Sequence, residues 1–428
     1  MRVLFIHQAF PAQFGRLALE LVERYGWSCH FLIESLSNCP APSKAMLETL
    51  DLRRLPVPAE PRPSSPTPWP QIYGRFLDLC QVVHDAARPL EDLQPDLVVA
   101  HGGRGAPTLF LPDIFDCPIL NYCEYYFARA RRDISYRIDL PPAEPAHFFP
   151  RSINAPTLAS LISCHGGYSA TRWQKESFPE RFWPKIEVHF DGIDIEQYKP
   201  GPRPSPAEVS ALLGGRSLGP DTKIVTYVAR GLESMRGFDV FMKVAKRIAR
   251  ERPDVLFVVA GQEEIYYGWD KLHTGQPSFK QWVLSRDTYD LSRFVFLGHI
   301  HPDRLADLLR LSDLHLYMTV PFVLSWSFIN ALASGPVVIG SDVPPVREVI
   351  TPGVHGLVEP LFDVDRWAES SLRVLADPAA YRPLTLAARG LIEERYSLDV
   401  SIPDLKDYFE RMASGLPPTP ALPHKGGG

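Results

Sequence analysis

The amino-acid sequence predicts an α/β protein built from two doubly wound parallel sheets. Short runs of apolar and β-branched residues alternate with longer stretches of helical periodicity. The short runs are apolar on both faces, as in parallel strands that helices cover on each side. The series occurs twice, before and after a stretch rich in proline and glycine that begins at Asp191. Strands separated by helices imply right-handed βαβ units in each half.

The first half of the chain carries several strand candidates of this kind. They cover residues 2–7, 28–33, 96–101, 118–122, 159–164 and 186–190. Between the first two lies an amphipathic stretch, residues 13–25, whose apolar residues include Leu17 and Leu21. That periodicity predicts a helix that packs on the first strands.

The second half repeats the same scheme. Its strand candidates are residues 223–228, 255–260, 294–298, 313–318 and 336–341. Its helical stretches are residues 237–251, 302–311 and 327–334. A second doubly wound sheet is therefore expected.

The proline- and glycine-rich stretch after Asp191 predicts a boundary between two domains. We assign residues 1–198 to an N-terminal domain and residues 199–398 to a C-terminal domain. Residues 399–416 are predicted to form one more helix. Residues 417–428 are low in complexity and are expected to be disordered.

Residues 56–70 hold seven prolines in fifteen positions, which excludes a helix or a central strand. Too few strands precede this segment for it to be a domain linker. We therefore interpret it as an excursion from the first domain, and peripheral contact with a membrane through it and Trp69 is left open.

Composition and charge exclude several classes of protein. The formal net charge is -5 on 48.2 kDa, with acids and bases interspersed, which argues against nucleic acid as a partner. No apolar run is long enough to span a membrane, and "MRVLFIHQAF" reads as a buried strand rather than a signal peptide. The six cysteines show no CxxC spacing, so reduced thiols in a cytoplasmic protein are expected.

Charged groups that suit an anion lie in "RGLESMRG", residues 230–237, directly after a predicted strand. Ligands of open α/β sheets gather at the carboxyl ends of strands. Arg230 and Arg236 sit there on a glycine-containing loop that enters a helix, an arrangement that suits a diphosphate. The alternative is a solvated loop with two surface arginines.

A second candidate lies in "PFVLSWSFINALASGPVVIGSDVPPVREVI", residues 321–350. Ser325, Trp326 and Ser327 precede a helix, so their backbone N–H groups could face an anion. Ser327 with Asn330 three positions later is similar to a capping box, and helix capping alone would also explain this pair.

Two further stretches carry polar groups at predicted strand ends. His101 in "HGGRGAP" could orient a hydroxyl or act as an acid or base, although a structural role is the alternative. "HFDGID" contains Asp191 and Asp194, and "DVD" contains Asp363 and Asp365. Pairs of acids this close are common by chance, so no metal site is predicted.

These four stretches, in this order, resemble the GT-B glycosyltransferases, specifically the retaining enzymes of glycosyltransferase family 4. The likeness runs from "HQAFPAQFGRLA" to "GVHGLVEP" at residues 353–360. "YVARGLESMRGFDVFM" is similar to the family's phosphate-binding loop, with Arg236 where lysine is commoner. "DGID" and the preceding "TRWQKESFP" match its interdomain turn, and residues 321–350 its nucleotide-sugar signature.

The resemblance implies two Rossmann-like domains facing across a cleft, with a nucleotide sugar on the C-terminal domain and an acceptor on the N-terminal one. It implies that the last helix crosses back to the first domain. The donor substrate would be a nucleoside-diphosphate sugar, with no other cofactor and no metal. The acceptor would be a glycan, a lipid-linked molecule or a small molecule, and the location the cytoplasm, with contact at the inner membrane face left open.

Residue by residue, the resemblance implies that Arg230 and Arg236 bind the diphosphate. Ser325, Trp326 and Ser327 would present N–H groups to the phosphate or donor sugar. His101 would lie near substrate hydroxyls and is grouped with the two arginines as catalytic. The segment from Phe10 to Phe14 would form a loop under the donor, without the glycine pair of many relatives.

The sequence departs from the family pattern at two positions. The family carries two glutamates separated by seven residues, and Phe322 and Asn330 stand there in this chain. Asn330 can still bond a ribose hydroxyl, whereas the Phe322 side chain cannot form a hydrogen bond. The leading interpretation is a retaining transferase that serves surface glycan synthesis. The alternatives are a non-catalytic GT-B protein that binds a nucleotide or a partner enzyme, and a sugar-nucleotide epimerase.

Overall fold

A computed structural model of the chain describes residues 1–37, 42–56, 69–103, 106–127, 132–133, 135–141 and 148–415, with the backbone alone at 69–72 and 149. The tail at 417–428 and most of the proline-rich excursion, with the Trp69 side chain, lie outside the described residues. Contacts divide the chain into two compact units. Unit 1 comprises Met1–Phe127, His147–Gly192 and Ser401–Gly428, and unit 2 comprises Ala128–Ala146 and Ile193–Val400.

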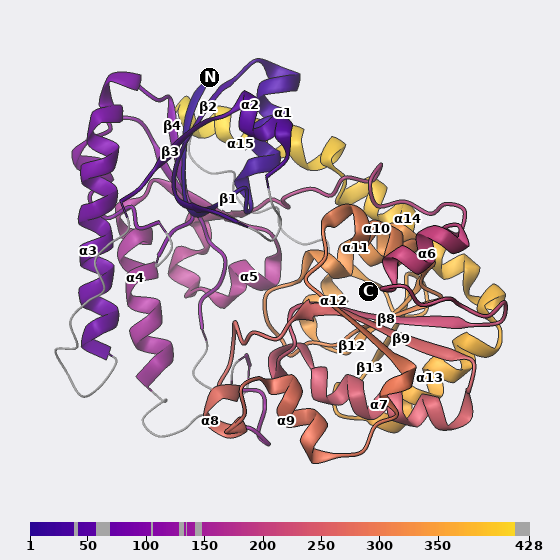
Figure 1. Ribbon diagram of the computed structural model, residues 1–428. Coiled ribbons are helices and arrows are strands. Elements are labelled where there is room, and N and C mark those ends of the chain that lie inside the picture. Colours follow the sequence, from indigo (N-terminus) through magenta and orange to yellow (C-terminus); the bar gives the residue numbers. More distant parts are fainter. Residues whose placement is uncertain are drawn as a thin grey trace, which may run out of the picture. The chain divides into compact units, whose positions relative to one another are not determined.

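Unit 1 is built on a parallel sheet of seven strands in the order β3-β2-β1-β4-β5-β6-β7 (Figure 1). The strands are β1 (Arg2–Phe10), β2 (Ser28–Leu36), β3 (Asp51–Arg54), β4 (Leu97–Ala100), β5 (Ile119–Tyr122), β6 (Gly166–Ser169) and β7 (Ile186–Val188). Its helices are α1 (Phe14–Tyr25), α2 (Lys44–Thr49), α3 (Trp69–Ala87), α4 (Phe149–Ser163), α5 (Arg172–Ser177) and most of α15 (Leu398–Ala413).

Helices cover both faces of this sheet because successive side chains of β1 point to opposite sides. Leu4 and Ile6 join a core cluster with residues of α3 and α4. Phe5, between them, points the other way, and its ring lies 5.4 Å from that of Phe14 in α1 and 6.4 Å from that of Phe409 in α15. The expected doubly wound arrangement is confirmed for this unit.

One predicted strand, residues 159–164, is wrong, because this segment is the last part of helix α4. A short apolar run does not distinguish a strand from a buried helix. The strand that follows, β6, has the sequence GGYS and so lacks the apolar signal of its neighbours. A side chain at Gly167 would place its Cβ 2.7 Å from the Asn121 carbonyl oxygen and from Cys123 Sγ, so glycine is needed for β6 to approach β5.

Unit 2 is built on a second parallel sheet, with six strands in the order β10-β9-β8-β11-β12-β13. The strands are β8 (Lys223–Gly231), β9 (Val255–Gln262), β10 (Phe294–Gly298), β11 (Leu314–Tyr317), β12 (Val337–Ser341) and β13 (Leu357–Glu359). The helices are α6 (Pro206–Leu212), α7 (Phe238–Glu251), α8 (Asp270–Thr274), α9 (Phe279–Arg286), α10 (Pro302–Leu311), α11 (Trp326–Ser334), α12 (Pro344–Val349), α13 (Val364–Ala376) and α14 (Arg382–Arg395).

The second sheet is also covered on both faces. Ile224 of β8 packs in a cluster with residues of α6 and α10. Tyr227, three residues later, points to the opposite face, and its ring lies 4.7 Å from that of Phe241 in α7. Figure 1 shows α7 and α13 on one side of this sheet and α10 and α11 on the other. The second doubly wound sheet is therefore confirmed as well.

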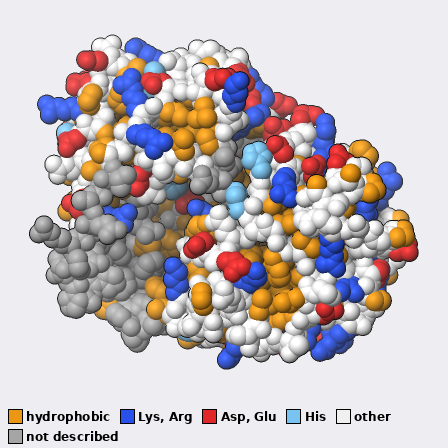
Figure 2. All heavy atoms as spheres, in the orientation of Figure 1, with side chains coloured by type: hydrophobic (Ala, Val, Ile, Leu, Met, Phe, Trp, Pro, Cys, Tyr) orange, Lys and Arg blue, Asp and Glu red, His pale blue; other side chains and the backbone are white. Residues whose placement is uncertain are grey.

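The mixed surface charge and the helix lengths agree with what the sequence predicts. On the face shown in Figure 2, acidic and basic side chains are interspersed and neither sign forms a continuous field. No helix in the described part of the chain is both long and apolar enough to cross a membrane. The described cysteines, Cys29, Cys80, Cys117, Cys123 and Cys164, are all free.

Helix α15 is held on unit 1 by a polar cluster around His189. Its ring nitrogens lie 2.6 Å from Asp404 Oδ2 and 3.3 Å from Glu187 Oε2, and its ring stacks on Tyr408 at 4.6 Å. Arg411 donates to both carboxylate oxygens of Glu187 at 2.8 and 2.9 Å. Burial lowers the pKa of His189, but the two carboxylates outweigh it and the pKa is raised above its ordinary value.

This cluster predicts a pH-dependent contribution to stability. Because the folded pKa of His189 is raised, its stabilising effect is complete below the unfolded pKa of about 6.5 and is lost as the pH rises through the folded value. In thermal unfolding, wild type is expected to exceed His189→Gln most at pH 5.5, with the gap in Tm narrowing by pH 8.5. A gap that stays constant with pH would contradict an ionised His189 in the cluster.

Candidate functional site

Each sheet has one point at which the strand order reverses. In unit 2 it lies between β8 and β11, and in unit 1 between β1 and β4. Loops on the two sides of such a point diverge at the carboxyl ends of the strands, where ligands of open α/β sheets bind. Arg230 lies at the carboxyl end of β8 and Arg236 in the loop after it, residues 318–325 follow β11, and His101 follows β4. The predicted site residues therefore lie at the topological switch points.

The loop after β8 is shaped by a single helical turn, Ser234–Arg236, and by Gly237. Gly237 has a φ of 63°, a conformation that glycine adopts without strain. A side chain there would also place its Cβ 2.8 Å from Cβ of Met318, the residue that follows β11. Glycine thus allows the loop that carries Arg236 to pack against the end of β11.

Arg236 is buried, with only 7% of its surface exposed. Its guanidinium donates to Thr319 Oγ1 at 3.0 Å and to the Val323 carbonyl at 3.1 Å, and lies 3.5 Å from the Tyr317 hydroxyl. Among the described residues, no acidic side chain forms a hydrogen bond or ion pair with it. This is a buried positive charge whose hydrogen-bond partners are all neutral.

Glu233, which was not among the predicted site residues, lies in the same loop and is fully buried. Its Oε2 accepts hydrogen bonds from the backbone N–H groups of Tyr266 and Tyr267 at 2.6 and 2.9 Å. Its Oε1 has no partner among the described residues. Burial raises the pKa of Glu233 to about 7, against the lowering effect of the Tyr267 N–H and of Arg236. The carboxyl group is therefore partly protonated near neutral pH.

Arg230 is exposed, and its guanidinium lies over the ring of Tyr266 at 4.1 Å from the centroid. This cation–π contact orients the Arg230 side chain. Tyr266 and Tyr267 follow β9 and were not among the site residues predicted from the sequence. The feature of the sequence that could have indicated them is a pair of adjacent tyrosines shortly after an apolar strand.

Helix α11 begins at Trp326, and its N-cap is Ser325, whose side chain accepts from the Ser327 N–H. The capping interpretation of Ser327 with Asn330 is therefore wrong, because Ser327 Oγ instead donates to the Val228 carbonyl at 3.2 Å. The Ser325 N–H donates to the Tyr317 hydroxyl at 3.0 Å. Tyr317 thus connects the start of α11 to Arg236, while two of the three selected N–H groups bond within the protein.

The two positions that depart from the family pattern are both buried. Phe322 is 2% exposed, and its ring lies 4.9 Å from that of Tyr267 and 5.8 Å from the Arg236 guanidinium carbon. Asn330 is 6% exposed, and its Oδ1 has no hydrogen-bond partner among the described residues. A buried amide oxygen without a partner is costly unless a ligand supplies a donor.

In unit 1, His101 lies beside His7 at the switch point between β1 and β4. Their rings are 4.8 Å apart, and His101 Nε2 is 3.5 Å from Glu124 Oε2. His7 Nδ1 accepts from the Ala9 N–H, so its Nε2 carries the proton and donates to Gln13. Burial, reinforced by His101, lowers the pKa of His7 to about 3, which keeps this ring neutral.

The segment from Phe10 to Phe14 connects β1 to α1. Both phenylalanines are fully buried. Gly15, in the first turn of α1, must be glycine because a Cβ there would collide with the ring of Pro11. The segment follows β1 at the switch point, and its role under a donor stays a prediction.

The paired acids serve local structure. Asp191 Oδ2 accepts from the Tyr122 hydroxyl at 3.4 Å, and Asp194 Oδ1 accepts from backbone N–H groups of its own turn. Asp363 caps α13, and Asp365 lies 3.9 Å from Arg247. The described residues contain no group of three or more His, Cys, Asp or Glu side chains arranged to hold a metal ion.

Two family models match the chain. The model described as Glycosyl transferase family 4 group matches residues 56–198, and the model described as Glycosyl transferases group 1 matches residues 216–390. The second match contains Arg230 at the end of β8, Arg236 in the loop after it, and helix α11.

Curated relatives are D-inositol 3-phosphate glycosyltransferases. That of Rhodococcus opacus is 27% identical over 212 residues, which cover 48% of this chain and 43% of the relative. That of Rhodococcus jostii is 26% identical over 256 residues, which cover 57% of this chain and 52% of the relative. The chain thus spans about half the length of the curated relatives it matches.

Solved structures resemble the chain over nearly its whole length. HepE of Anabaena in complex with UDP and glucose matches with a TM-score of 0.66 at 15% identity, over 96% of this chain and 99% of that one. Sucrose-phosphate synthase of Thermosynechococcus elongatus matches with a TM-score of 0.69 at 17% identity, over 97% and 100%. At this identity the likeness establishes the fold, which is the GT-B architecture.

The raised pKa of Glu233 predicts how stability changes with pH. Above pH 4.5 the unfolded chain releases the proton of Glu233, while the folded protein keeps it until about pH 7. The free energy of unfolding of wild type should therefore fall across this interval relative to Glu233→Gln, which cannot ionise. Chemical denaturation at pH 5 and pH 8 measures the difference. Parallel pH profiles for the two proteins would show that Glu233 is ionised throughout.

Proposed function

This chain belongs to the GT-B glycosyltransferases of family 4 and group 1, and from that premise we propose that it transfers a sugar from a nucleoside-diphosphate sugar to an acceptor hydroxyl. The proposal includes retention of the anomeric configuration, a reaction without a metal ion, and a role in the synthesis of surface glycans or glycoconjugates. It also places the protein in the cytoplasm, at or near the inner face of the membrane.

The observation that carries the proposal is Arg236. An arginine buried to this degree normally pairs with carboxylates, because an uncompensated buried charge is strongly destabilising. The partners of Arg236 are two hydroxyls and a carbonyl, and Glu233 nearby is partly protonated at neutral pH. Such a site gains most from an anionic ligand, and it lies where α/β sheets bind nucleotides.

Arg236 and Arg230 would together stabilise the diphosphate as it leaves the sugar. Negative charge grows on the departing oxygen in the transition state, and fixed cations near it lower the barrier. Each charge-assisted hydrogen bond contributes about 1.5–3 kcal/mol. A change of about 1.4 kcal/mol alters a rate tenfold, so the two arginines together would raise the rate by several powers of ten. In the proposed mechanism they take the place of the metal ion that other transferases use.

The nucleoside would be recognised at helix α11. The unsatisfied Oδ1 of Asn330 is an acceptor that suits a ribose hydroxyl. UDP and glucose in the crystal structure of HepE make a UDP-sugar the first donor to test. The names of the curated relatives suggest a phosphorylated polyol as one small-molecule acceptor, which we propose would be oriented by His101 and its neighbour Glu124.

Phe322 favours a second candidate function, that of a GT-B protein that binds a nucleotide or partner enzyme without turnover. Its buried ring occupies the position at which the family pattern has a glutamate, and it packs on Tyr267. Binding and turnover must therefore be measured separately.

The proposed function is tested with a panel of UDP-, GDP-, ADP- and TDP-sugars. One nucleotide class should raise the Tm of the purified protein, and that class should also release free nucleotide slowly, faster once an acceptor is added. Stabilisation without release in the presence of acceptors would identify the binding-only alternative. No response to any donor would refute both.

Arg236→Ala is the matched variant for this panel, with Arg252→Ala, an arginine paired with Asp254 before β9, as its control. Loss of one donor to a developing anion lowers turnover by a factor of about 10²–10³. Arg236→Ala should show this loss, and the control should keep wild-type turnover. Arg236→Lys should recover part of the rate, because an ammonium keeps the charge but fewer hydrogen bonds.

Asn330 predicts a distinct signature in nucleotide binding. Asn330→Ala should weaken a nucleoside and its diphosphate equally, roughly fivefold to tenfold for one hydrogen bond. Wild type should prefer ribonucleotides over their 2′-deoxy or 3′-deoxy forms, and the variant should have lost that preference. Isothermal titration with the ribonucleotide, its 2′-deoxy form and its 3′-deoxy form measures this preference in both proteins. An unchanged preference in Asn330→Ala would show that Asn330 does not contact the ribose.

A further inference from the structure

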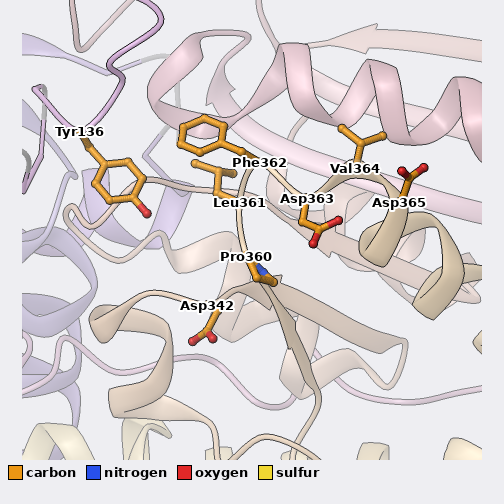
Figure 3. Close-up of a pocket in the computed structure, with 8 residues that line it drawn as sticks. All are labelled: Tyr136, Asp342, Pro360, Leu361, Phe362, Asp363, Val364 and Asp365. Atoms are coloured by element: carbon orange, nitrogen blue, oxygen red, sulfur yellow. The ribbon is translucent and has the colours of Figure 1, made fainter.

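Residues 135–141 pack closely on the rest of unit 2. The ring of Tyr136 stacks on that of Phe362 with centroids 5.9 Å apart, at one end of an open pocket of about 610 Å³ (Figure 3). The Pro141 carbonyl lies 2.6 Å from Nε2 of His273 in α8. Between these two contacts lies Arg137, which is 2% exposed.

All five N–H donors of the Arg137 guanidinium are used. Two bonds reach Asp139 in its own turn, at 2.9 and 2.7 Å. Two more reach the carboxylate of Asp239, in the first turn of α7, at 2.9 and 2.8 Å. The fifth reaches the Ser234 carbonyl at 3.0 Å. Two carboxylates therefore neutralise Arg137, and no donor remains for a ligand.

The groups that Arg137 joins lie on either side of Arg236. Ser234 begins the helical turn that ends at Arg236, and Asp239 follows in the helix that continues from it. The N–H and hydroxyl of Ser234 both donate to Asp270, so its remaining polar atom, the carbonyl, is the one that Arg137 holds. The turn is thereby fixed at both ends by buried charged groups.

We propose that Arg137 is a positioning residue for the diphosphate site: by joining Ser234 to Asp239 it fixes the turn that carries Arg236. The inference rests on the proposed function, since it needs a diphosphate as ligand. Arg137 touches no ligand itself. Its effect reaches the ligand through the placement of the Arg236 guanidinium, where a small displacement weakens charge-assisted hydrogen bonds steeply.

The test compares a nucleoside diphosphate with its own nucleoside. UDP, GDP and ADP are titrated into the full-length protein beside uridine, guanosine and adenosine, and the pair that binds wild type most tightly is used. Arg137→Met should weaken the diphosphate roughly tenfold to a hundredfold and the nucleoside less than twofold, because only the diphosphate contacts Arg236. Arg137→Lys should fall between, since it keeps the charge opposite Asp239 but makes fewer bonds.

Arg293→Met is the matched control, because Arg293 also donates to backbone carbonyls, those of Arg252 and Val255, at the opposite, amino end of β9. It should lower Tm without changing the ratio of diphosphate to nucleoside affinity.

Equal losses for both ligands in Arg137→Met would show that Arg137 is merely structural and overturn the inference while leaving the proposed function intact. Absence of diphosphate binding in wild type would overturn both. If Arg137→Met does not fold, Asp139→Ala, at the exposed side of the guanidinium, must show the same selective loss in weaker form or the inference fails.

Discussion

The buried charge of Arg236 is the constraint on which the arrangement of the second sheet's carboxyl edge depends. Burying a guanidinium is favourable only when its charge and its donors are both compensated. Thr319, Tyr317 and the Val323 carbonyl satisfy donors, yet none carries a negative charge. Arg137, in the same unit and buried still more deeply, has two carboxylates. The contrast separates an arginine whose charge two carboxylates neutralise from one whose hydrogen-bond partners are all neutral.

The sequence was sufficient for those parts of the structure that rest on apolar periodicity and strand order. The runs at 2–7 and 223–228 are central strands, as their mainly apolar character on both faces indicates. Arg236 and His101 could be selected because parallel strands bring their carboxyl ends to one edge, so a polar residue just past a strand lies near the switch point. The position of a site follows from topology, and topology follows from the alternation of strands and helices.

What the sequence could not provide is pairing between distant side chains. The strand GGYS carries no apolar signal, and only the approach of Gly167 to the Asn121 carbonyl explains it. Nothing local distinguishes Arg137 from any surface arginine, because its partner Asp239 lies 102 residues away. Glu233 stood in the selected loop, but its raised pKa arises from complete burial, which the neighbouring residues do not reveal. These contacts and this pKa shift depend on three-dimensional packing, which the periodicity of apolar residues in the sequence does not reveal.

The role of Phe322 follows from the fact that the hydrogen-bond partners of Arg236 are all neutral. A carboxylate held at this position, with the ring centroid 5.8 Å from the guanidinium carbon, would attract Arg236 and compete with any anionic ligand for it. A phenyl ring leaves the positive charge available and contributes a favourable cation–π contact. If the site binds a diphosphate, as proposed, Phe322 in place of a carboxylate would remove a polar contact and strengthen the attraction of Arg236 for phosphate. For the proposed transferase, discrimination among donors should therefore rest more on the nucleotide diphosphate than on the sugar.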